Sequence, residues 1–461
     1  MSYTGSYLGL PSAWSSNSDG FFTAEEYSLP LPRNSVRLTR KNVKRDVDTA
    51  MPVTPSNPLI RWRIPSNSSV LVDFKRAKIL LDLSVAAPAP WSARCSTLAW
   101  NLFDRVRLEQ GGQYVEDRRF FYLQESLTYT TQTHINQQIT TGVALYGDGS
   151  QAMRNNRAAG WRYVLPFPTT ALTKSIYPWF QMKRNVSGGF EVASLPDTYI
   201  QWELVKPEQF VEVFGAPPGT ALPTSSTGLT YTITRMQIEY EEVYPEGGPN
   251  MILSKWLSPS MFATRGGFPR VWFRTWITNI YPLSTNTEQT IYTDFKLSSI
   301  NTIIVFARYS ANNNNPGIYD KQTDYIGKND MPLIEYQWEI NSSLWPDKPI
   351  SLVDNSWAEG YTKYLEAWQM FHSRGIQQEV TPITIDQFLN DKFLIIFDGV
   401  QNPFSPAMLN PVSTANSGSI SNLRLKWSSP PPAGIEIVVN VQHWKCWNFG
   451  SLGGSIPVIE V

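Results

Sequence analysis

The sequence predicts an all-β protein made of two consecutive eight-stranded antiparallel jelly rolls, with a few short helices and long loops. The 461 residues are too many for one ordinary core and enough for two domains of roughly 200 residues each. The composition, with 17 Trp, 21 Tyr and 22 Phe punctuated by 34 Pro and 28 Gly, favours many short strands over long helices. Strand-like segments recur in both halves, about eight in each, and a jelly roll is the commonest way to fold eight such strands.

In the first half, alternation of apolar with polar or charged residues indicates strands, because successive side chains of a strand point to opposite faces. The segment 103–112 (FDRVRLEQGG) shows this alternation and ends in a Gly-Gly turn. The best linker signal in the middle of the chain is EGGPN, at 246–250. The other predicted strands of this half are 59–64, 70–85 (two strands or one bent strand), 199–205 and 231–243.

After the linker signal the strand pattern begins again. Its candidates are 271–283, 290–297, 301–310, 333–341, 392–397, 419–427 and 434–447. Helix signals are few. In 356–373 six aromatic and leucine residues fall at spacings of 3, 4 and 7, which stack on one helical face. A weaker helix is predicted at 115–127. One helix in each half is a second sign that the halves are duplicates.

The predicted organisation has four parts and two long polar insertions. The insertions, 128–160 and 311–330, are too long for ordinary connections, and such loops are usually functional or surface-exposed. The four parts are an extended N-terminal arm (1–57), a first jelly roll (58–248), a second jelly roll (249–450) and a C-terminal tail (451–461).

The charge balance argues against a general nucleic-acid coat, because 39 basic and 39 acidic side chains leave no positive excess to bind phosphate. One basic cluster stands out in the arm. It is either solvated or a contact with anionic lipid, nucleic acid or a neighbouring acidic subunit. Its members are Arg33, Arg37, Arg40, Lys41, Lys44 and Arg45.

Other signals point to a soluble protein made in a reducing compartment. Cys95 and Cys446 show neither metal-type spacing nor a disulfide framework. No secretory signal is visible, and no apolar run approaches the ~18 residues of a membrane span. The sequence gives no sign of a cofactor. The three glycosylation sequons, at Asn67, Asn185 and Asn341, are interpreted as chance occurrences.

Evidence for catalysis is weak. The histidines (His134, His372 and His443) are not at metal-ligand spacing, and no nucleophile elbow or phosphate-binding loop is present. Paired carboxylates that flank a sugar bond remain an option, although the sequence cannot show whether two of them lie about 5–10 Å apart. More simply, these acids lie on solvated strand faces. They are Asp82, Glu239, Glu241, Glu242, Asp398 and Glu436. The Trp and Tyr residues could stack on sugars, but such residues more often supply core and interface area.

Several motifs resemble one protein family. ITIDQFLNDKFLIIFDG followed by SGSISNLRLKWSSPPPAGIEIVVNVQHW is similar to the carboxy-terminal roll of double jelly-roll major capsid proteins. These are shared by tailless bacterial, adenovirus-like, Polinton-like and large eukaryotic DNA viruses. Phe388, Phe397 and Asp398 match a family phrase, whereas Asn390-Asp391 and Gly399-Val400 depart from it.

The first half resembles the same family. FDRVRLEQGGQYVEDRRFFYLQ is similar to its strand-turn-helix segment, and WRYVLPFPTTAL followed by TYIQWELV is similar to a later strand pair. The segment TKYLEAW has similar neighbours in the Polinton-like branch. The likeness spans about residues 58 to 450, and the order of degenerate motifs carries it.

The resemblance implies a structural virion protein rather than an enzyme, one that forms homotrimers with pseudo-hexagonal outlines tiling an icosahedral shell. Asp398 would then end a core strand and would not be a catalyst. The loops 128–160 and 311–330 would be outer or intersubunit loops. Partners would be further copies, minor capsid or penton proteins and, through the arm, an internal membrane or the genome, with no small-molecule substrate. The protein would be made in the host cytoplasm or nucleus. The alternative is a carbohydrate-binding or glycoside-cleaving double β-sandwich.

Overall fold

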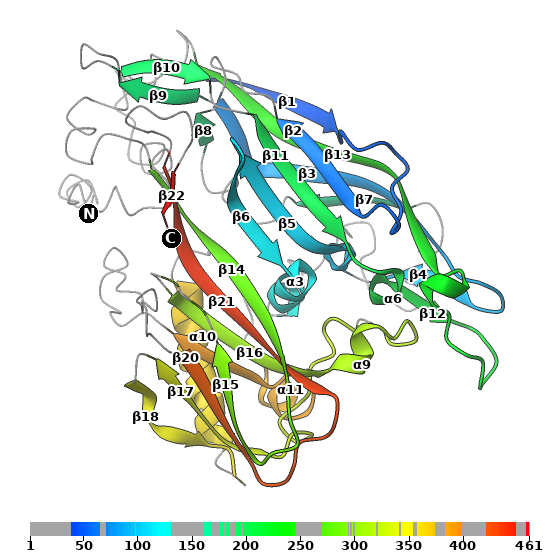
Figure 1. Ribbon diagram of the computed structural model, residues 1–461, viewed down its shortest axis with the longest axis vertical. Helices are drawn as coiled ribbons and strands as arrows, with labels where there is room; N and C mark the ends of the chain where they lie inside the picture. The colour runs from blue at the N-terminus through cyan, green and yellow to red at the C-terminus, as the bar shows by residue number, and fades with distance from the viewer. Residues whose placement is uncertain are drawn as a thin grey trace, which may run out of the picture.

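The computed structural model contains two β-sandwiches that lie side by side (Figure 1). The first, roll 1, is built from strands that end at or before Pro245, and the second, roll 2, from strands that begin at Arg270 or later. The structure describes residues 38–64, 71–96, 98–130, 161–166, 176–178, 180–184, 190–194, 197–245, 270–293, 295, 297, 300–319, 321–340, 343–353, 357–373, 383–398, 421–448 and 458–460.

Roll 1 consists of two antiparallel sheets. Sheet 1a has the order β1 (Leu38–Asp46), β13 (Thr230–Pro245), β3 (Leu71–Ala86) and β7 (Trp161–Pro166), and β8 (Ile176–Pro178) also pairs with β3. Sheet 1b has the order β2 (Leu59–Ile64), β11 (Thr198–Leu204), β5 (Phe103–Gln110) and β6 (Gln113–Arg119). Two small ribbons accompany them, β4 (Ser92–Cys95) with β12 (Val211–Phe214), and β9 (Phe180–Arg184) with β10 (Phe190–Ser194).

Roll 2 repeats this plan. Sheet 2a has the order β14 (Arg270–Pro282), β21 (Ile435–Asn448), β16 (Ile300–Tyr309) and β19 (Leu394–Asp398), and β22 (Val458–Glu460) also pairs with β21. Sheet 2b has the order β15 (Glu288–Thr293), β20 (Ser421–Trp427), β17 (Leu333–Ile340) and β18 (Ser343–Ser351).

The two rolls have one strand order. If the eight main strands of each roll are counted along the chain, both have a first sheet in the order 1-8-3-6 and a second in the order 2-7-4-5. This is the two-sheet order of a jelly roll, so the predicted fold class is confirmed. In both rolls a helix follows the fifth strand: α3 (Phe121–Thr130) follows β6, and α10 (Trp357–Ser373) follows β18. The predicted duplication is therefore present in the topology.

Short helices complete the described chain. They are η2 (Ala99–Leu102), α6 (Pro207–Phe210), η5 (Ser225–Thr227), α9 (Ser310–Asn313) and α11 (Ile385–Asn390). The last is capped by Thr384, whose hydroxyl accepts a hydrogen bond from the Gln387 amide while the Gln387 side chain accepts one from the Thr384 amide.

Aromatic side chains fill the core of roll 1. Trp202 of β11 packs edge-on against Trp62 and Phe103, with ring centroids 5.1 and 4.5 Å apart, and Trp100 meets Phe121 of α3 at 5.9 Å. These side chains are almost wholly buried. Because edge-to-face pairs add to the large area that each ring buries, this cluster fixes α3 on sheet 1b.

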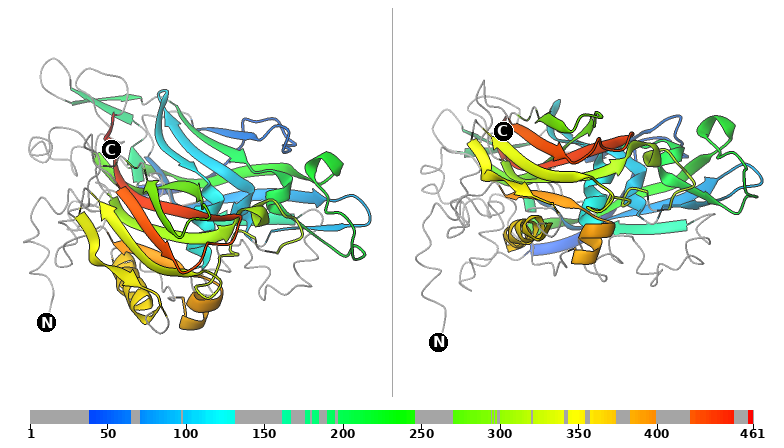
Figure 2. Two further views of the ribbon diagram at one scale, coloured as in Figure 1. Left: turned by 60° about the horizontal axis from the view of Figure 1, so that its bottom comes forward. Right: turned by 90° about the horizontal axis from the view of Figure 1, so that it is seen from below.

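In roll 2 the core extends under both helices. Tyr361 and Tyr364 of α10 contact Phe388 of α11, at ring-centroid distances of 5.2 and 6.1 Å. Figure 2 shows α10 and α11 on the same side of roll 2. Gly360 lets α10 approach closely, since a Cβ there would lie 2.5 Å from a methyl carbon of Leu352.

Three sequence expectations need correction. Leu38–Asp46, assigned to the arm, form strand β1 of sheet 1a, because β13 offers a row of acidic partners. Val458–Glu460, assigned to the tail, pair with β21. The weak helix at 115–127 begins only at Phe121, because residues up to Arg119 pair with β5 as β6. The predicted boundary at 248/249 lies outside the described residues.

Candidate functional site

The two rolls meet at a joint formed by unlike surfaces. Strand β14 of roll 2 packs against β6 and α3 of roll 1. A second contact runs from the β16–β17 connection of roll 2 to the β4–β12 ribbon of roll 1 (Figure 1). Sheet 2a therefore lies between roll 1 and sheet 2b.

Buried hydrogen-bonding side chains, most of them uncharged, hold the first contact. Gln124 of α3 donates from Nε2 to Thr278 Oγ1 at 2.9 Å, and Thr278 in turn donates to Asn440 Oδ1 at 2.6 Å. Nearby, Thr275 Oγ1 donates to Glu116 Oε1 of β6 at 2.9 Å. All five side chains are buried. A buried polar group without a partner costs about 1–3 kcal/mol. Any other placement of the two rolls would break these hydrogen bonds, so they specify how roll 2 sits against roll 1.

Charged groups at the joint are paired. Arg118 donates to Gln124 at 2.7 Å and to Glu125 Oε1 at 3.1 Å. Burial raises the pKa of Glu125, and the Arg118 charge opposes that rise. Within sheet 2a of roll 2, Arg308 Nε lies 2.5 Å from Glu436 Oε1. Burial also lowers the pKa of Lys445, against the attraction of Glu116 and Asp117 in roll 1.

The second contact is made by a segment that we call the strap, residues 310–319 and 321–330. Lys321 Nζ donates to three backbone carbonyls, of Glu208 and Val211 in roll 1 at 2.5 and 3.3 Å and of Asn315 in the strap at 3.2 Å. The Val213 amide donates to the Pro316 carbonyl at 2.8 Å. Burial lowers the pKa of Lys321 to about 8, while Glu212 and Glu208 oppose the change.

A buried ion pair lies beneath the strap. Arg94 of β4 and Glu212 of β12 are directly opposite in the ribbon, with Nε and Oε2 2.9 Å apart, and each side chain is 1% exposed. The ring of Tyr319 in the strap lies over the Arg94 guanidinium, 3.8 Å from its centre. Further along, the strap reaches α11, where a Cβ on Gly327 would lie 2.2 Å from the Asn390 carbonyl carbon. The strap thus ties roll 1 to the helical side of roll 2.

Comparison with solved structures identifies this arrangement. No family model matches the chain, and no curated protein matches it in sequence. One similar structure is the capsid of the virus PBCV-1, with a TM-score of 0.51 at 10% identity over 94% of this chain and 99% of that one. Another is PBCV-1 VP54 as fitted into a reconstruction of the virophage Sputnik, with a TM-score of 0.54 at 9% identity and the same coverage. The chain has the double jelly-roll fold of viral capsid proteins. At these identities the likeness concerns the fold.

Within the double jelly roll, the strap corrects one expectation. The segment 311–330 was predicted as an outer or intersubunit loop, yet Lys321, Gln322, Tyr325 and Ile326 are buried inside one chain. Its length is needed to span from sheet 2a to the β4–β12 ribbon and back. The other predicted loop, 128–160, lies outside the described residues from 131 onward, and 128–130 complete α3.

The basic cluster is only partly within the described residues, since Arg33 and Arg37 lie outside them. Arg40 is 2.8 Å from Asp73 and 2.7 Å from Glu241, and Lys44 is 3.4 Å from Glu239. Arg45 pairs with Glu242 at 3.5 Å and donates to the Tyr240 hydroxyl. Lys41 is exposed on the same strand. The acids of β13 and β3 therefore pair with three of the four members that the structure describes.

These pairs also account for most of the carboxylates weighed as catalysts. Glu239, Glu241 and Glu242 each have a basic partner on β1, and Glu436 has Arg308. Asp82 lies in β3, and Asp398 is the last residue of β19, as the resemblance implied.

The histidines fall in three different places. Burial and the nearby Lys445 lower the pKa of His443 to about 3, so its imidazole is neutral at ordinary pH. His372 lies in α10, and His134 is outside the described residues. Among the described residues, no group of His, Cys, Asp and Glu side chains could hold a metal ion, and no helix is long and apolar enough to cross a membrane.

Sequence reasoning missed the joint. Arg94 and Glu212 are 118 positions apart, and Lys321 is 113 positions from Glu208. The one available signal was a lone charge inside a short apolar strand, as in VEVF (211–214), where Val211 and Val213 are buried on both sides of Glu212. A charge that cannot reach water from such a strand must have a buried partner.

Proposed function

We propose that the chain is a viral major capsid protein that forms homotrimers with a pseudo-hexagonal outline, which tile an icosahedral shell. The observation that carries this proposal is the joint between two rolls of one strand order. The likeness of the fold to the PBCV-1 capsid supports it.

The geometry of the joint favours a ring. Roll 1 contributes β6 and α3, and roll 2 contributes sheet 2a, so the two contacting surfaces are different. Head-to-tail contacts of this kind close into rings when the rotation between units permits. Each roll keeps an equivalent surface that the joint does not use, namely β18 with α10 on roll 2 and the outward face of sheet 1a on roll 1. Three copies that repeat the joint would form a ring of six rolls.

The unused surfaces suit contacts that form after folding. On sheet 1a, the Lys44 side chain is 57% exposed and ion-paired to Glu239. On α10, Lys363 and Glu366 form an exposed pair 2.8 Å apart. Charges that stay solvated in the free chain keep it soluble, and mixed charge sets the register of association more than its strength.

Further parts of the proposal concern other partners. We propose the virion as the location of the protein, after synthesis in the host cytoplasm or nucleus, with minor capsid or penton proteins at special positions of the shell. For the basic cluster we propose a neighbouring capsid subunit rather than an internal membrane or the genome, because Arg40, Lys44 and Arg45 already have acidic partners.

The test is the native mass of the purified protein by light scattering at modest salt. We expect a species of three times 52.3 kDa that survives dilution. The K44E variant, which reverses a charge on sheet 1a, should shift this species toward monomer while lowering the melting temperature of the monomer only slightly, because the pair with Glu239 is largely exposed. K426E, on sheet 2b, is the matched control and should remain trimeric. A wild-type monomer at all concentrations would contradict the proposal.

A further inference from the structure

The outward face of sheet 2b carries a regular grid of side chains. Three strands each contribute three alternating residues, and cross-strand pairing aligns them in rows. Neighbouring strands lie about 4.8 Å apart and alternate residues about 7 Å apart, so the grid covers a small, shallow rectangle. The rows are Glu288–Lys426–Glu335, Thr290–Arg424–Gln337 and Tyr292–Asn422–Glu339.

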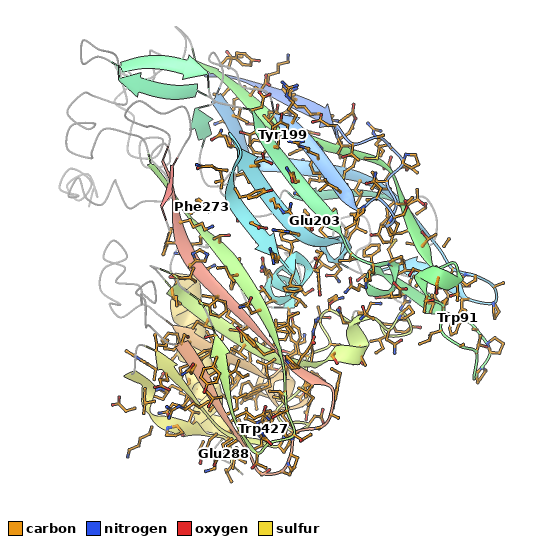
Figure 3. The ribbon with its side chains drawn as sticks, in the orientation of Figure 1. Trp91, Tyr199, Glu203, Phe273, Glu288 and Trp427 are labelled. Carbon is orange, nitrogen blue, oxygen red and sulfur yellow. The ribbon has the colours of Figure 1, made fainter. Side chains whose placement is uncertain are left out.

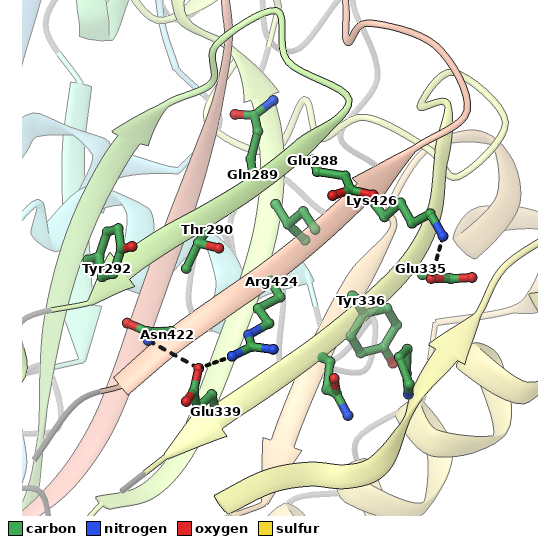
Figure 4. A pocket seen from close by; sticks show the side chains of 13 residues that line it. Glu288, Gln289, Thr290, Tyr292, Glu335, Tyr336, Glu339, Asn422, Arg424 and Lys426 are labelled. Atoms are coloured by element: carbon green, nitrogen blue, oxygen red, sulfur yellow. Dashed lines mark hydrogen bonds and ion pairs between the residues drawn. The ribbon is translucent and has the colours of Figure 1, made fainter. Parts of the chain in front are cut away.

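The grid is hollowed around its central residue, Arg424, whose guanidinium turns toward Glu339. Thr290 and Asn422 are short, and they leave a depression of about 660 Å³ that all nine grid residues line (Figure 4). Tyr292 stands at its side with 70% of its surface exposed, although aromatic rings are usually covered. Asn422 lies on the floor and is 6% exposed. Its Nδ2 donates to Glu339 at 3.4 Å, and its Oδ1 has no hydrogen-bond partner.

The charges around the hollow are largely compensated. Arg424 lies 2.6 Å from Glu339, and Lys426 lies 3.3 Å from Glu335. Hydrogen bonds from Arg424 and Asn422 lower the pKa of Glu339, so it is ionised at neutral pH. With Glu288, the grid has three acids and two bases. This balance disfavours an anionic ligand and leaves carboxylate, amide and guanidinium groups that can bond to hydroxyls.

We propose that the hollow on sheet 2b binds a neutral oligosaccharide. The exposed ring of Tyr292 would pack against the apolar face of one sugar ring, and the Glu339 carboxylate, which Asn422 holds in the same row, would accept a hydrogen bond from a hydroxyl of that sugar. The Glu288 carboxylate, four residues away on β15, would accept one from a neighbouring sugar. The carboxylate, amide and guanidinium groups of the grid can form hydrogen bonds with a ligand that has many hydroxyls, and such a ligand brings no charge that would disturb the existing ion pairs.

The location allows access. Sheet 2b lies on the side of roll 2 that faces away from roll 1, beyond sheet 2a (Figure 1). The ring proposed above uses sheet 1a, β18 and α10, so the strands β15 and β20 that carry Tyr292 and Asn422 stay outside it. The inference is independent of the trimer.

Sheet 1b provides an internal control. Its topologically equivalent grid is filled, since Arg61 lies flat on Tyr199 with its guanidinium 3.7 Å from the ring centre, and Arg107 bonds to Glu203. Figure 3 shows Tyr199 and Glu203 on this face and Glu288 on sheet 2b. Tyr114 of β6 is 48% exposed there, and it serves as an exposed tyrosine on the other roll.

The experiment is a glycan array probed with the purified full-length protein, followed by titration calorimetry. Probes for the titration are maltohexaose, cellohexaose and chitohexaose, with a heparin hexasaccharide as the acidic comparison. We expect wild type to bind at least one neutral glycan and not heparin. Y292A should weaken that binding at least tenfold, Y292W should retain it, and N422A should weaken it several-fold. Y114A should bind as wild type does.

Three results would overturn the inference. They are no neutral glycan bound by wild type, heparin preferred over neutral glycans, or binding unchanged in Y292A. Melting temperatures check that the variants are folded. Because the Tyr292 side chain is exposed, its substitution should hardly change the melting temperature. If Y292A changes the native mass and wild type binds no glycan, the face is a contact between copies and the inference fails, while the trimer proposal stands.

Discussion

The outward faces of sheets 1a and 2a occupy the same place in their rolls but have different chemistry. On sheet 2a this face is buried against roll 1 and uses Thr278 and Asn440, which are uncharged. On sheet 1a it is exposed and carries ion pairs such as Lys44–Glu239. A contact that the chain makes with itself is always present, so it can use buried, uncharged side chains such as Thr278 and Asn440, which bond to each other. A face that is exposed to water before copies of the chain associate keeps its charges solvated, because burying each of them would cost several kcal/mol.

Charge does enter the joint, at Arg118 and Glu125 and again under the strap, where an ion pair is fully enclosed. Arg94 and Glu212 lie between the ribbon and Tyr319, and Lys321 is surrounded by carbonyls. A buried pair of this kind adds little net stability compared with apolar residues, yet removing one partner is costly. The strap therefore makes one arrangement of the two rolls much lower in free energy than any arrangement that would separate these charges.

The largest expected effect comes from breaking that enclosed pair. In E212A, Arg94 loses its counterion while remaining buried, and we expect the free energy of unfolding to fall by about 3–5 kcal/mol. Denaturant unfolding followed by tryptophan fluorescence measures this. The matched control is E335A, which breaks the half-exposed pair with Lys426 and should cost less than about 1 kcal/mol.

A double substitution sharpens this result. R94M combined with E212L replaces the pair by apolar side chains and should recover most of the loss, since neither charge remains buried alone. If E212A and E335A proved equally mild, the idea that enclosure distinguishes the two pairs would be wrong.

The next effect tests the uncharged contact. Q124A removes the donor to Thr278 and the acceptor of Arg118, leaving both buried, and should cost about 1–3 kcal/mol. The comparison is T362A, at an exposed position on the topologically equivalent helix α10, which should change stability by at most about 0.5 kcal/mol. Thermal unfolding checks both. Similar losses in the two variants would mean that α3 and α10 are equally embedded.

The strands could be predicted wherever the two faces of a strand differ. Strand β2 was predicted at its observed bounds, because Ile60, Trp62 and Ile64 are buried and alternate with arginines. Strand β1 could not be, since LTRKNVKRD has charges on both faces and only Val43 packs on the core. It is a strand because β13 supplies the complementary acids, and that information lies about 200 positions away.

The site was harder to predict for the same reason. A hydrogen bond such as Gln124–Thr278 joins residues 154 positions apart, and neither residue is unusual in its own segment. The hollow on sheet 2b depends on which residues of three strands share a row, and therefore on register. Periodicity gives each strand its two faces, but only pairing decides which side chains become neighbours.

A smaller effect concerns pH and the strap. The pKa of Lys321 falls from 10.5 to about 8 in the folded chain, so between these values the unfolded chain binds more protons. Its contribution to stability therefore rises as pH increases from about 8 to 10.5, and the cost of burying the ammonium is present below that window. K321M should remove this part of the pH dependence, as measured by melting temperatures from pH 7 to 10.5. K363M, on the exposed face of α10, should leave it unchanged. A K321M profile parallel to that of wild type would mean that Lys321 does not titrate in this range.

The smallest effect comes from the exposed side of the comparison. K44A removes the ion pair with Glu239 on sheet 1a, where the lysine is 57% and the glutamate 23% exposed. Because water and salt screen such a pair, the loss in stability should be about 0.2–1 kcal/mol and should vanish at 1 M salt. Denaturant unfolding of the dilute monomer at low and high salt measures it. The same substitution should weaken the trimer more than it destabilises the monomer, because in the proposed ring this face becomes covered. If K44A destabilised the monomer by as much as E212A does, sheet 1a would already be an enclosed face, and the distinction between a permanent contact and one made between copies would fail.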